Sequence, residues 1–249
     1  MTISPIGTQD QDKRMKLGVA ATSALAVGGA FAHIAKKQGF SLSPSAIRKT
    51  PIKDWAIFSI YDKKNPLKKE VTLEGKEIIE LASASVAGGL AGGLLFDDKK
   101  YRKSKLRESV NQLLGNVLVP VGVVWGASEL YKKNENSIMK FVPQITEKGK
   151  VSKYFNTALR AIPGSVVTLI ALGTGIFVGN KVSNFINEKI YHKKVDRDIK
   201  ATDFAPHVDD IGIAVSLMAD KSKGASLIQR VIPAFLCVPG YQTGTHRDV

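Results

Sequence analysis

The chain has 249 residues, of which 44% are hydrophobic and 23% are charged, and its 36 basic and 22 acidic residues give a net charge of +14. Its one cysteine, Cys237, excludes an intrachain disulfide framework. The length would allow a single soluble domain. The charged residues, however, gather in the connections between long uncharged runs instead of recurring at a helical period of 3.6 residues, and this pattern favours a membrane protein.

Four stretches are apolar over the length that a bilayer requires. A helix needs about 20 apolar residues to cross a hydrocarbon core about 30 Å thick. The candidate spans are Leu17–Ala35, residues 78–96 with an uncharged core at Leu81–Phe96, Ser109–Ser128 and Ala161–Asn180. The sequence therefore predicts an all-α integral membrane helical bundle of about four spans within residues 17–190. A polar basic tail at 1–16 precedes this membrane domain, and a small peripheral helical region at 191–249 follows it.

The first candidate span also has the features of a secretory signal. Three basic residues at positions 13–16 precede it, and Ala30-Phe31-Ala32 is a small-x-small sequence of the kind that signal peptidases cleave. We favour a retained span, because the polar leader is long and the apolar run continues past this sequence to Ala35. A cleaved signal would still leave three later spans.

Each candidate span carries small residues at four-residue spacing, which places them on one face of a helix. In lipid no hydrophobic drive holds helices together, so close backbone approach through small residues supplies the association. The second span is the clearest example, because its opposite face stays apolar, unlike a flexible Gly/Ala linker. The predicted packing residues are Ala20, Ala24, Gly28, Ala32, Ala84, Gly88, Gly92, Ser85, Gly89, Gly93, Gly122, Gly126, Ala171, Gly175 and Gly179.

Two features of the connections are candidates for contact with the bilayer surface. The apolar patch Trp55–Tyr61 is too short to span, and either it lies in the interface or it forms a small buried element. A basic block directly follows the second span, and it either attracts anionic lipid headgroups or forms a solvated loop. The predicted headgroup-binding residues are Lys99, Lys100, Arg102, Lys103, Lys105 and Arg107.

Asn111, Gln112 and Asn116 are the polar residues nearest the interior of a candidate span. Amide side chains in lipid either bridge helices by hydrogen bonds or line a path for a solute. We favour bridging, because a solute path typically carries ionisable residues deep in a helix. In this chain His33 and Glu80 lie only at the ends of the apolar segments.

The C-terminal region contains one metal-like group of residues, Asp203, His207, Asp209 and Asp210. Carboxylates together with an imidazole can bind a divalent ion. The run His207-Val208-Asp209-Asp210 is similar to the His-Pro-Asp-Asp motif of zinc-dependent sugar deacetylases, and this four-residue resemblance implies a metal-dependent hydrolase. Val208 replaces the proline of that motif. We favour a role in capping, because the two aspartates precede an apolar helix and are favourable at its positive end, and we predict no metal site.

No phosphate-cradling loop, nucleophile elbow, dinucleotide fingerprint or nucleic-acid-binding module occurs in the sequence. We therefore expect no enzymatic activity, no cofactor and no nucleic-acid partner. The expected partners are the lipid bilayer, including anionic lipids, and further copies of the chain in a homo-oligomer.

The preferred hypothesis for function is a structural or assembly role in a membrane through glycine-faced helix packing. One alternative is a transporter or channel component in which the three amides line the path. Another is a metal-dependent hydrolase centred on His207. Basic residues are shared almost evenly between the two sides of the predicted bundle, so the positive-inside rule predicts no orientation.

Overall fold

The computed structural model describes residues 6–49, 71, 73, 75–146, 149–193, 198–208 and 234–248, and within them the chain is helical and contains no strand. The long helices are α1 (Ile6–Lys37), α4 (Gly75–Phe96), α6 (Val119–Met139) and α7 (Lys150–Lys189). The shorter ones are α2 (Pro44–Lys49), η1 (Lys99–Tyr101), α5 (Arg102–Asn111), η2 (Gln112–Leu118), η3 (Ala201–His207) and α10 (Val238–Thr245). The predicted all-α class is thus confirmed for the described residues.

Four helical segments among the described residues are long and apolar enough to cross a membrane. They are Asp10–Lys37, Gly75–Phe96, Lys99–Met139 and Phe155–Lys189. Each contains one of the predicted spans, so the expectation of four helices with the length and composition of spans is confirmed. The patch Trp55–Tyr61 lies outside the described residues.

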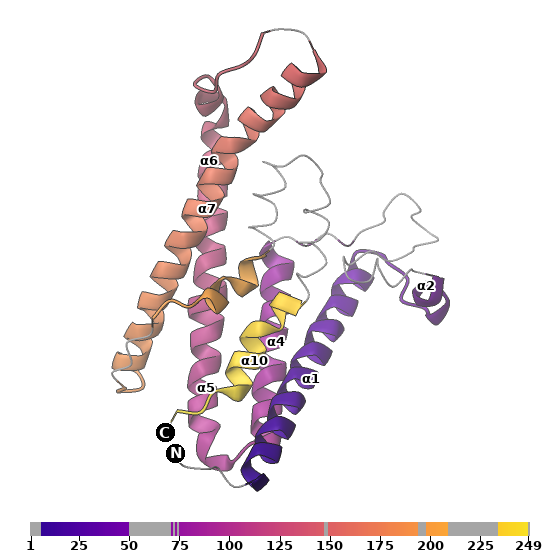
Figure 1. The fold of residues 1–249 in the computed structure, drawn as a ribbon, viewed down its shortest axis with the longest axis vertical. Coiled ribbons are helices and arrows are strands. Elements are labelled where there is room, and N and C mark those ends of the chain that lie inside the picture. Colours follow the sequence, from indigo (N-terminus) through magenta and orange to yellow (C-terminus); the bar gives the residue numbers. More distant parts are fainter. Residues whose placement is uncertain are drawn as a thin grey trace.

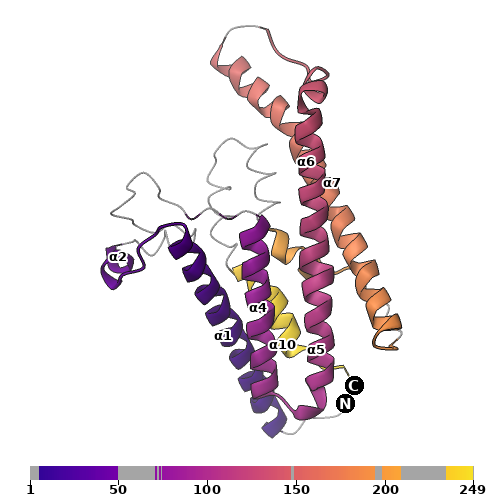
Figure 2. The same ribbon diagram turned by 180° about the vertical axis from the view of Figure 1, so that it is seen from behind.

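Figures 1 and 2 show how the helices are arranged. Helices α1 and α4 pack against each other, and α5, η2 and α6 follow one another in a single column beside α7. The upper parts of α6 and α7 extend beyond the ends of α1 and α4 in both views. Both ends of the described chain lie at the opposite end of the bundle, close to the turn between α4 and α5.

The first helix begins earlier than the predicted span. Helix α1 starts at Ile6, so the described part of the predicted polar tail is helical and runs directly into the apolar segment. Lys16 and Asp12 form an ion pair of 2.6 Å one turn apart, a spacing that supports helical structure.

Helix α4 meets α1 through its glycines. A Cβ atom at Gly88 would lie 2.5 Å from the backbone oxygen of Thr22, and one at Gly92 would lie 2.9 Å from the Cα atom of Val19. Because real Cβ atoms do not approach other atoms so closely, a larger residue at either position would force the helices apart. Close approach of backbones is the geometry by which small residues associate helices in lipid.

The second glycine row of α4 meets α10. Cβ atoms at Gly89 and Gly93 would lie 2.6 Å and 2.8 Å from the Cα atoms of Gly240 and Gly244 respectively. The backbone N–H of Gly240 also donates to the hydroxyl of Ser85 at 3.1 Å. This part of the C-terminal region therefore lies directly along α4, while the predicted peripheral position stays a prediction for the residues that are not described.

Helix α7 crosses the α5–η2–α6 column through two further glycines. A Cβ atom at Gly175 would lie 2.7 Å from the Cα atom of Pro120, and one at Gly115 would lie 2.9 Å from the backbone oxygen of Gly179. Ala171, Gly175 and Gly179 are all buried. This row of α7 thus faces the column.

Two predicted small-residue rows, apart from the half-buried Ala32, face away from the rest of the described residues. Ala20, Ala24 and Gly28 are exposed on α1, and Cβ atoms at Gly28, Gly122 and Gly126 would meet nothing within 4 Å. The face of α1 that meets α4 is instead the one that carries Val19 and Thr22. The larger side chains of this face fit against the glycines of α4.

Large apolar side chains cover the outside of the long helices. Leu25 is 76% exposed, Trp125 69% and Ile170 65%. The buried apolar residues form a cluster between α1 and α4 around Ile34 and Leu81, and a second between α6 and α7 around Val124 and Leu172. Apolar side chains therefore point both inward and outward, as expected for helices that contact lipid.

Candidate functional site

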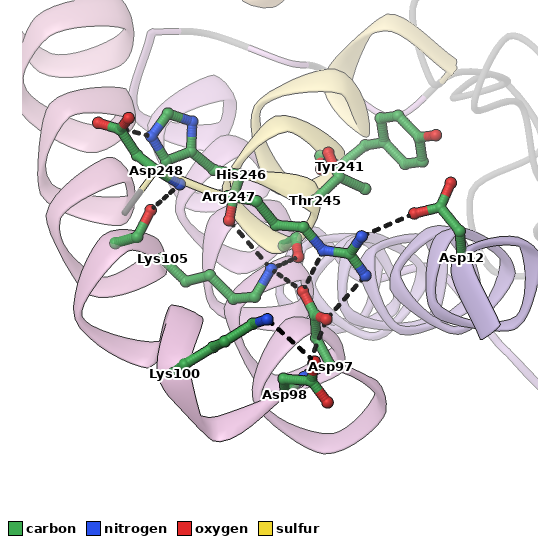
Figure 3. A network of polar contacts seen from close by, with 12 residues as sticks. Asp12, Asp97, Asp98, Lys100, Lys105, Tyr241, Thr245, His246, Arg247 and Asp248 are labelled. Atoms are coloured by element: carbon green, nitrogen blue, oxygen red, sulfur yellow. Dashed lines mark hydrogen bonds and ion pairs between the residues drawn. The ribbon is translucent and has the colours of Figure 1, made fainter. Parts of the chain in front are cut away.

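A network of buried charges occupies the end of the bundle that holds both described chain ends (Figure 3). Asp97 directly follows α4, and its side chain is 0% exposed. Lys105 Nζ lies 2.8 Å from one carboxylate oxygen, while the Arg247 guanidinium binds both oxygens, at 2.8 and 2.9 Å. Arg247 also contacts Asp12 of α1 at 3.0 Å. The network therefore ties together α1, α4, α5 and the chain after α10.

The carboxyl group of Asp97 is strongly acidic. Burial by itself would raise its pKa, but the hydrogen bonds from Arg247 and Lys105 outweigh burial and lower the pKa to about 2. The carboxylate is thus charged at neutral pH and compensates the buried ammonium of Lys105.

Two basic residues of the predicted headgroup-binding block are buried in this network, which corrects the expectation for them. The ammonium of Lys105 donates to the backbone oxygens of Gly244 and His246. Arg107 pairs with Asp248. Both lie on the face of α5 that packs against the C-terminal segment, so neither side chain is available to lipid. Lys99, Lys100, Arg102 and Lys103 are exposed.

A ladder of polar side chains continues the network along α5 and η2. Glu108, Gln112 and Asn116 are spaced four residues apart, and each hydrogen bonds to the next, at 2.7 and 2.9 Å. Gln112 also bonds to Gln242 of α10 at 3.0 Å, and Asn116 bonds to Asp203 of η3 at 2.9 Å. Two of the three predicted amides therefore connect their own helix to other elements.

The third predicted amide connects α5 to α7. Asn111 Nδ2 donates to Asn187 Oδ1 at 3.1 Å, and the hydroxyl of Ser183 lies 3.5 Å from the backbone oxygen of Asn111. Asn111 and Asn187 are both buried.

His207 of η3 contacts the backbone of η2 one turn before Pro120. In an α-helix the carbonyl of Asn116 would accept a hydrogen bond from residue 120, but proline has no N–H. His207 Nε2 lies 2.9 Å from this carbonyl oxygen. Because a carbonyl only accepts, Nε2 carries the hydrogen and donates it to this carbonyl. Asn116 lies within the π-helical η2, a type of irregularity often found at functional sites.

The predicted metal-like group is described only in part. Asp203 accepts from Asn116 and, at 2.9 Å, from the backbone N–H of Lys200. Asp203 and His207 are thus both directed at Asn116. Asp209 and Asp210 lie outside the described residues, and the residues that are described contain no group of three or more His, Cys, Asp or Glu side chains able to hold a metal ion.

A polar cavity of about 550 Å³ opens beside the charge network around Asp97 and the polar ladder of α5 and η2. It lies between α5, α7 and the C-terminal segment. Its walls carry buried side chains of α5 and α7 together with more exposed ones near the chain end. The lining residues are Arg107, Glu108, Asn111, Asn187, Asp198, Lys200, Gln242, Thr245, His246, Arg247 and Asp248.

Sequence reasoning missed the part that the chain end plays in this site. Arg247 and Asp248 lie within the last three residues, and their partners lie about 150 positions earlier. One available signal was the four-residue spacing of Gly240 and Gly244, which repeats the pattern of the predicted spans. The segment is too short for a span and contains Pro239, so this spacing alone does not predict a packed helix.

Comparison with known proteins gives no match to any protein family, curated protein or solved structure.

Proposed function

We propose that the protein is an integral membrane protein with a structural role, in which a closed helical bundle anchors the α6–α7 hairpin at one face of the bilayer. The observation that carries this proposal is the use of both glycine rows of α4 within one chain. Gly88 and Gly92 pack on α1, whereas Gly89 and Gly93 pack on α10. Such a helix is held on two sides by close backbone contact, which favours a rigid assembly.

The buried amides support the same role. Gln112 and Asn116 hydrogen bond to each other, to Gln242 and to Asp203. Side chains with these partners cross-link helices, and opening a solute path along them would require breaking the bonds. This arrangement favours the structural hypothesis over the alternative of a transporter or channel component.

The exposed row on α1 supports association of copies. Ala20, Ala24 and Gly28 contact no other part of the described chain closely, and the flanking Leu17 and Leu25 are exposed. In lipid, this combination would let a second α1 approach closely. We propose that copies of the chain associate through this face.

Membrane fractionation and reconstitution test the structural role. We expect the protein to stay in the membrane pellet after an alkaline wash and to require detergent for extraction. Vesicles that contain the purified protein should retain trapped ions and small solutes as well as empty vesicles do. Release into the soluble fraction would reject the membrane assignment, and protein-dependent solute flux would favour the transporter alternative.

Cysteine cross-linking tests the association of copies. Because Cys237 is the one native cysteine, a Cys237→Ala background permits a single cysteine at Ala24. We expect Ala24→Cys to give an oxidised dimer in membranes. Ala91→Cys is the matched control, since Ala91 is exposed on α4. Equal cross-linking at both positions, or none at Ala24→Cys, would contradict association through α1.

A further inference from the structure

A second polar cavity lies in the α6–α7 hairpin. Its volume is about 500 Å³, and it lies between the loop after α6 and the first turns of α7. Figures 1 and 2 show this part of the hairpin beyond the ends of α1 and α4. The ionisable side chains of its described lining are Lys153 and Arg160, so the lining is positively charged.

Hydrogen bonds hold the loop against α7 and give this cavity a fixed wall. The backbone N–H of Ile145 donates to Asn156 Oδ1 at 2.8 Å, and Asn156 Nδ2 donates to the backbone oxygen of Ile145 at 2.9 Å. Arg160 Nε donates to Gln144 Oε1 at 3.1 Å. The loop is thus joined to two successive turns of α7, and the amide of Asn156 is fully used by these bonds.

The groups that remain for a ligand are positively charged donors. Lys153 and Arg160 lie two turns apart on one face of α7. Neither forms an ion pair with another described residue, and the described lining contains no carboxylate. The arginines of the cavity beside α5 are, by contrast, paired with carboxylates. Because ammonium and guanidinium groups only donate, the cavity fits a ligand that carries negative charge and accepts hydrogen bonds.

Phosphate oxygens match these donors. A guanidinium can bind two phosphate oxygens at once, and an ammonium adds a second positive charge. The Nε of Arg160 is held by Gln144, so its terminal N–H groups are the ones left for a ligand. Ser152 adds a hydroxyl to the same lining, and a hydroxyl can donate to a phosphate oxygen.

The position of Arg160 in the chain selects the source of the phosphate. Arg160 is the last charged residue before the uncharged run Ala161–Asn180. If this run crosses the hydrocarbon core, Arg160 lies at its boundary, where the headgroup layer is about 5–7 Å thick. Lys153 lies about 10 Å farther along the helix axis. Lipid phosphates are therefore concentrated at the level of Arg160, whereas a soluble anion has to come from bulk water.

We propose that this cavity binds the phosphate group of an anionic lipid of the protein's own bilayer. Arg160 contacts the phosphate, and Lys153 supplies the second positive charge. This inference rests on the proposed membrane role and adds to it a lipid that holds the hairpin at the bilayer surface. The site lies at the opposite end of the bundle from the basic block at residues 99–107 (Figure 1).

Radiolabelled phosphatidic acid with six-carbon chains is the probe, and equilibrium dialysis against the full chain in an uncharged detergent is the measurement. We expect saturable binding that phosphatidylcholine of the same chain length does not displace. Arg160→Gln and Lys153→Gln should each weaken binding about fivefold, since a basic residue near a lipid surface contributes about 1 kcal/mol. Glutamine at position 160 keeps an N–H for the Gln144 side chain.

Two further variants separate the cavity from charge in general. Thr157→Phe keeps both cations but places a ring between them on the same face of α7, and it should weaken binding about fivefold or more. Lys133→Gln is the matched control, because it removes the same charge from an exposed position on α6. We expect it to bind the probe as wild type does. Thermal midpoints in detergent identify any variant that has not folded.

Each contrary result has a defined meaning. Equal weakening by Lys133→Gln and Arg160→Gln, or wild-type binding by all the cavity variants, would overturn the cavity as the site. Inorganic phosphate or polyglutamate that displaces the probe at equal concentration would overturn the assignment to a lipid, in favour of a soluble anion or an acidic protein. Release of the protein by an alkaline wash would instead reject the membrane role itself, and that fractionation does not depend on the binding assay.

Discussion

Arg247 forms a bidentate ion pair with Asp97, although 150 positions separate the two residues in the chain. The pair joins the segment after α10 to the end of α4. Arg247 is 30% exposed at its side chain, while Asp97 is fully buried. The segment after α10 is therefore held in the bundle by an ion pair with the buried carboxylate of Asp97, which directly follows α4.

Replacement of Arg247 tests this dependence. In Arg247→Ala the buried carboxylate of Asp97 keeps Lys105 but loses both guanidinium bonds. Because an uncompensated buried charge is costly, we expect a loss of roughly 1–3 kcal/mol in stability. The measurement is the thermal midpoint in detergent. Lys189→Ala removes an exposed ion pair with Glu188 and is the control. Similar midpoints for both variants would contradict the role of the pair.

The pH dependence of stability follows from the same carboxylate. The pKa of Asp97 is about 2 in the folded protein, below its ordinary value of 3.8. A lowered pKa stabilises the folded state above the ordinary value, and this contribution is lost as the pH falls from about 4 to about 2.

Asp97→Asn isolates this contribution. We expect the variant to be less stable than wild type at pH 6 and the difference in thermal midpoint to shrink between about pH 4 and pH 2. A difference that stays constant over this range would show that the charge of Asp97 is not the stabilising feature.

Substitutions at the α4 glycines can show that helix packing is a separate step from membrane insertion. Gly88→Ile with Gly92→Ile keeps the segment apolar but places branched side chains against the α1 backbone. We expect normal membrane fractionation with a loss of about 1–3 kcal/mol or more from overpacking. The loss would appear as a lower thermal midpoint in detergent.

Ala87→Ile with Ala91→Ile is the matched control for the glycine pair. Both alanines lie on α4 and are exposed, so the added side chains meet no other helix of the described chain. We expect little change in the thermal midpoint. Equal effects of the two double variants would show that the glycine row is not a packing surface.

The contact between His207 and the Asn116 carbonyl can be tested by rescue. His207→Ala leaves this buried carbonyl without its side-chain donor, and we expect a loss of about 1–3 kcal/mol. Pro120→Ala supplies a backbone N–H, which in the i→i+4 register of an α-helix would serve this carbonyl. In a double-mutant cycle, His207→Ala should therefore cost less in the Pro120→Ala background. Thermal midpoints that add independently would contradict this explanation.

The same His207→Ala variant distinguishes the capping hypothesis from the hydrolase alternative. We expect purified wild type and variant to have the same metal content by elemental analysis. Stoichiometric zinc in wild type that is lost in the variant would instead support a metal-dependent hydrolase.

The four helices with the length and apolarity of spans could be predicted from the sequence because their cause is local. A run such as Ala161–Asn180 contains no charge over about the length that lipid requires. A helix satisfies its own backbone hydrogen bonds, so no other part of the chain is needed to predict it. The spacing of Gly88 and Gly92 likewise places them on one face from the period of the helix alone.

Only the tertiary structure decided which of these faces are packed. Ala24 and Gly88 belong to equally regular rows, but Gly88 meets α1 whereas Ala24 is exposed. Lys105 belongs to a basic block that lies mostly on the surface, yet it is buried because Asp97 and the backbone oxygens of Gly244 and His246 surround its ammonium. Periodicity determines which residues share a helix face, but it does not determine which distant segment covers that face, since that choice depends on contacts between residues far apart in the chain.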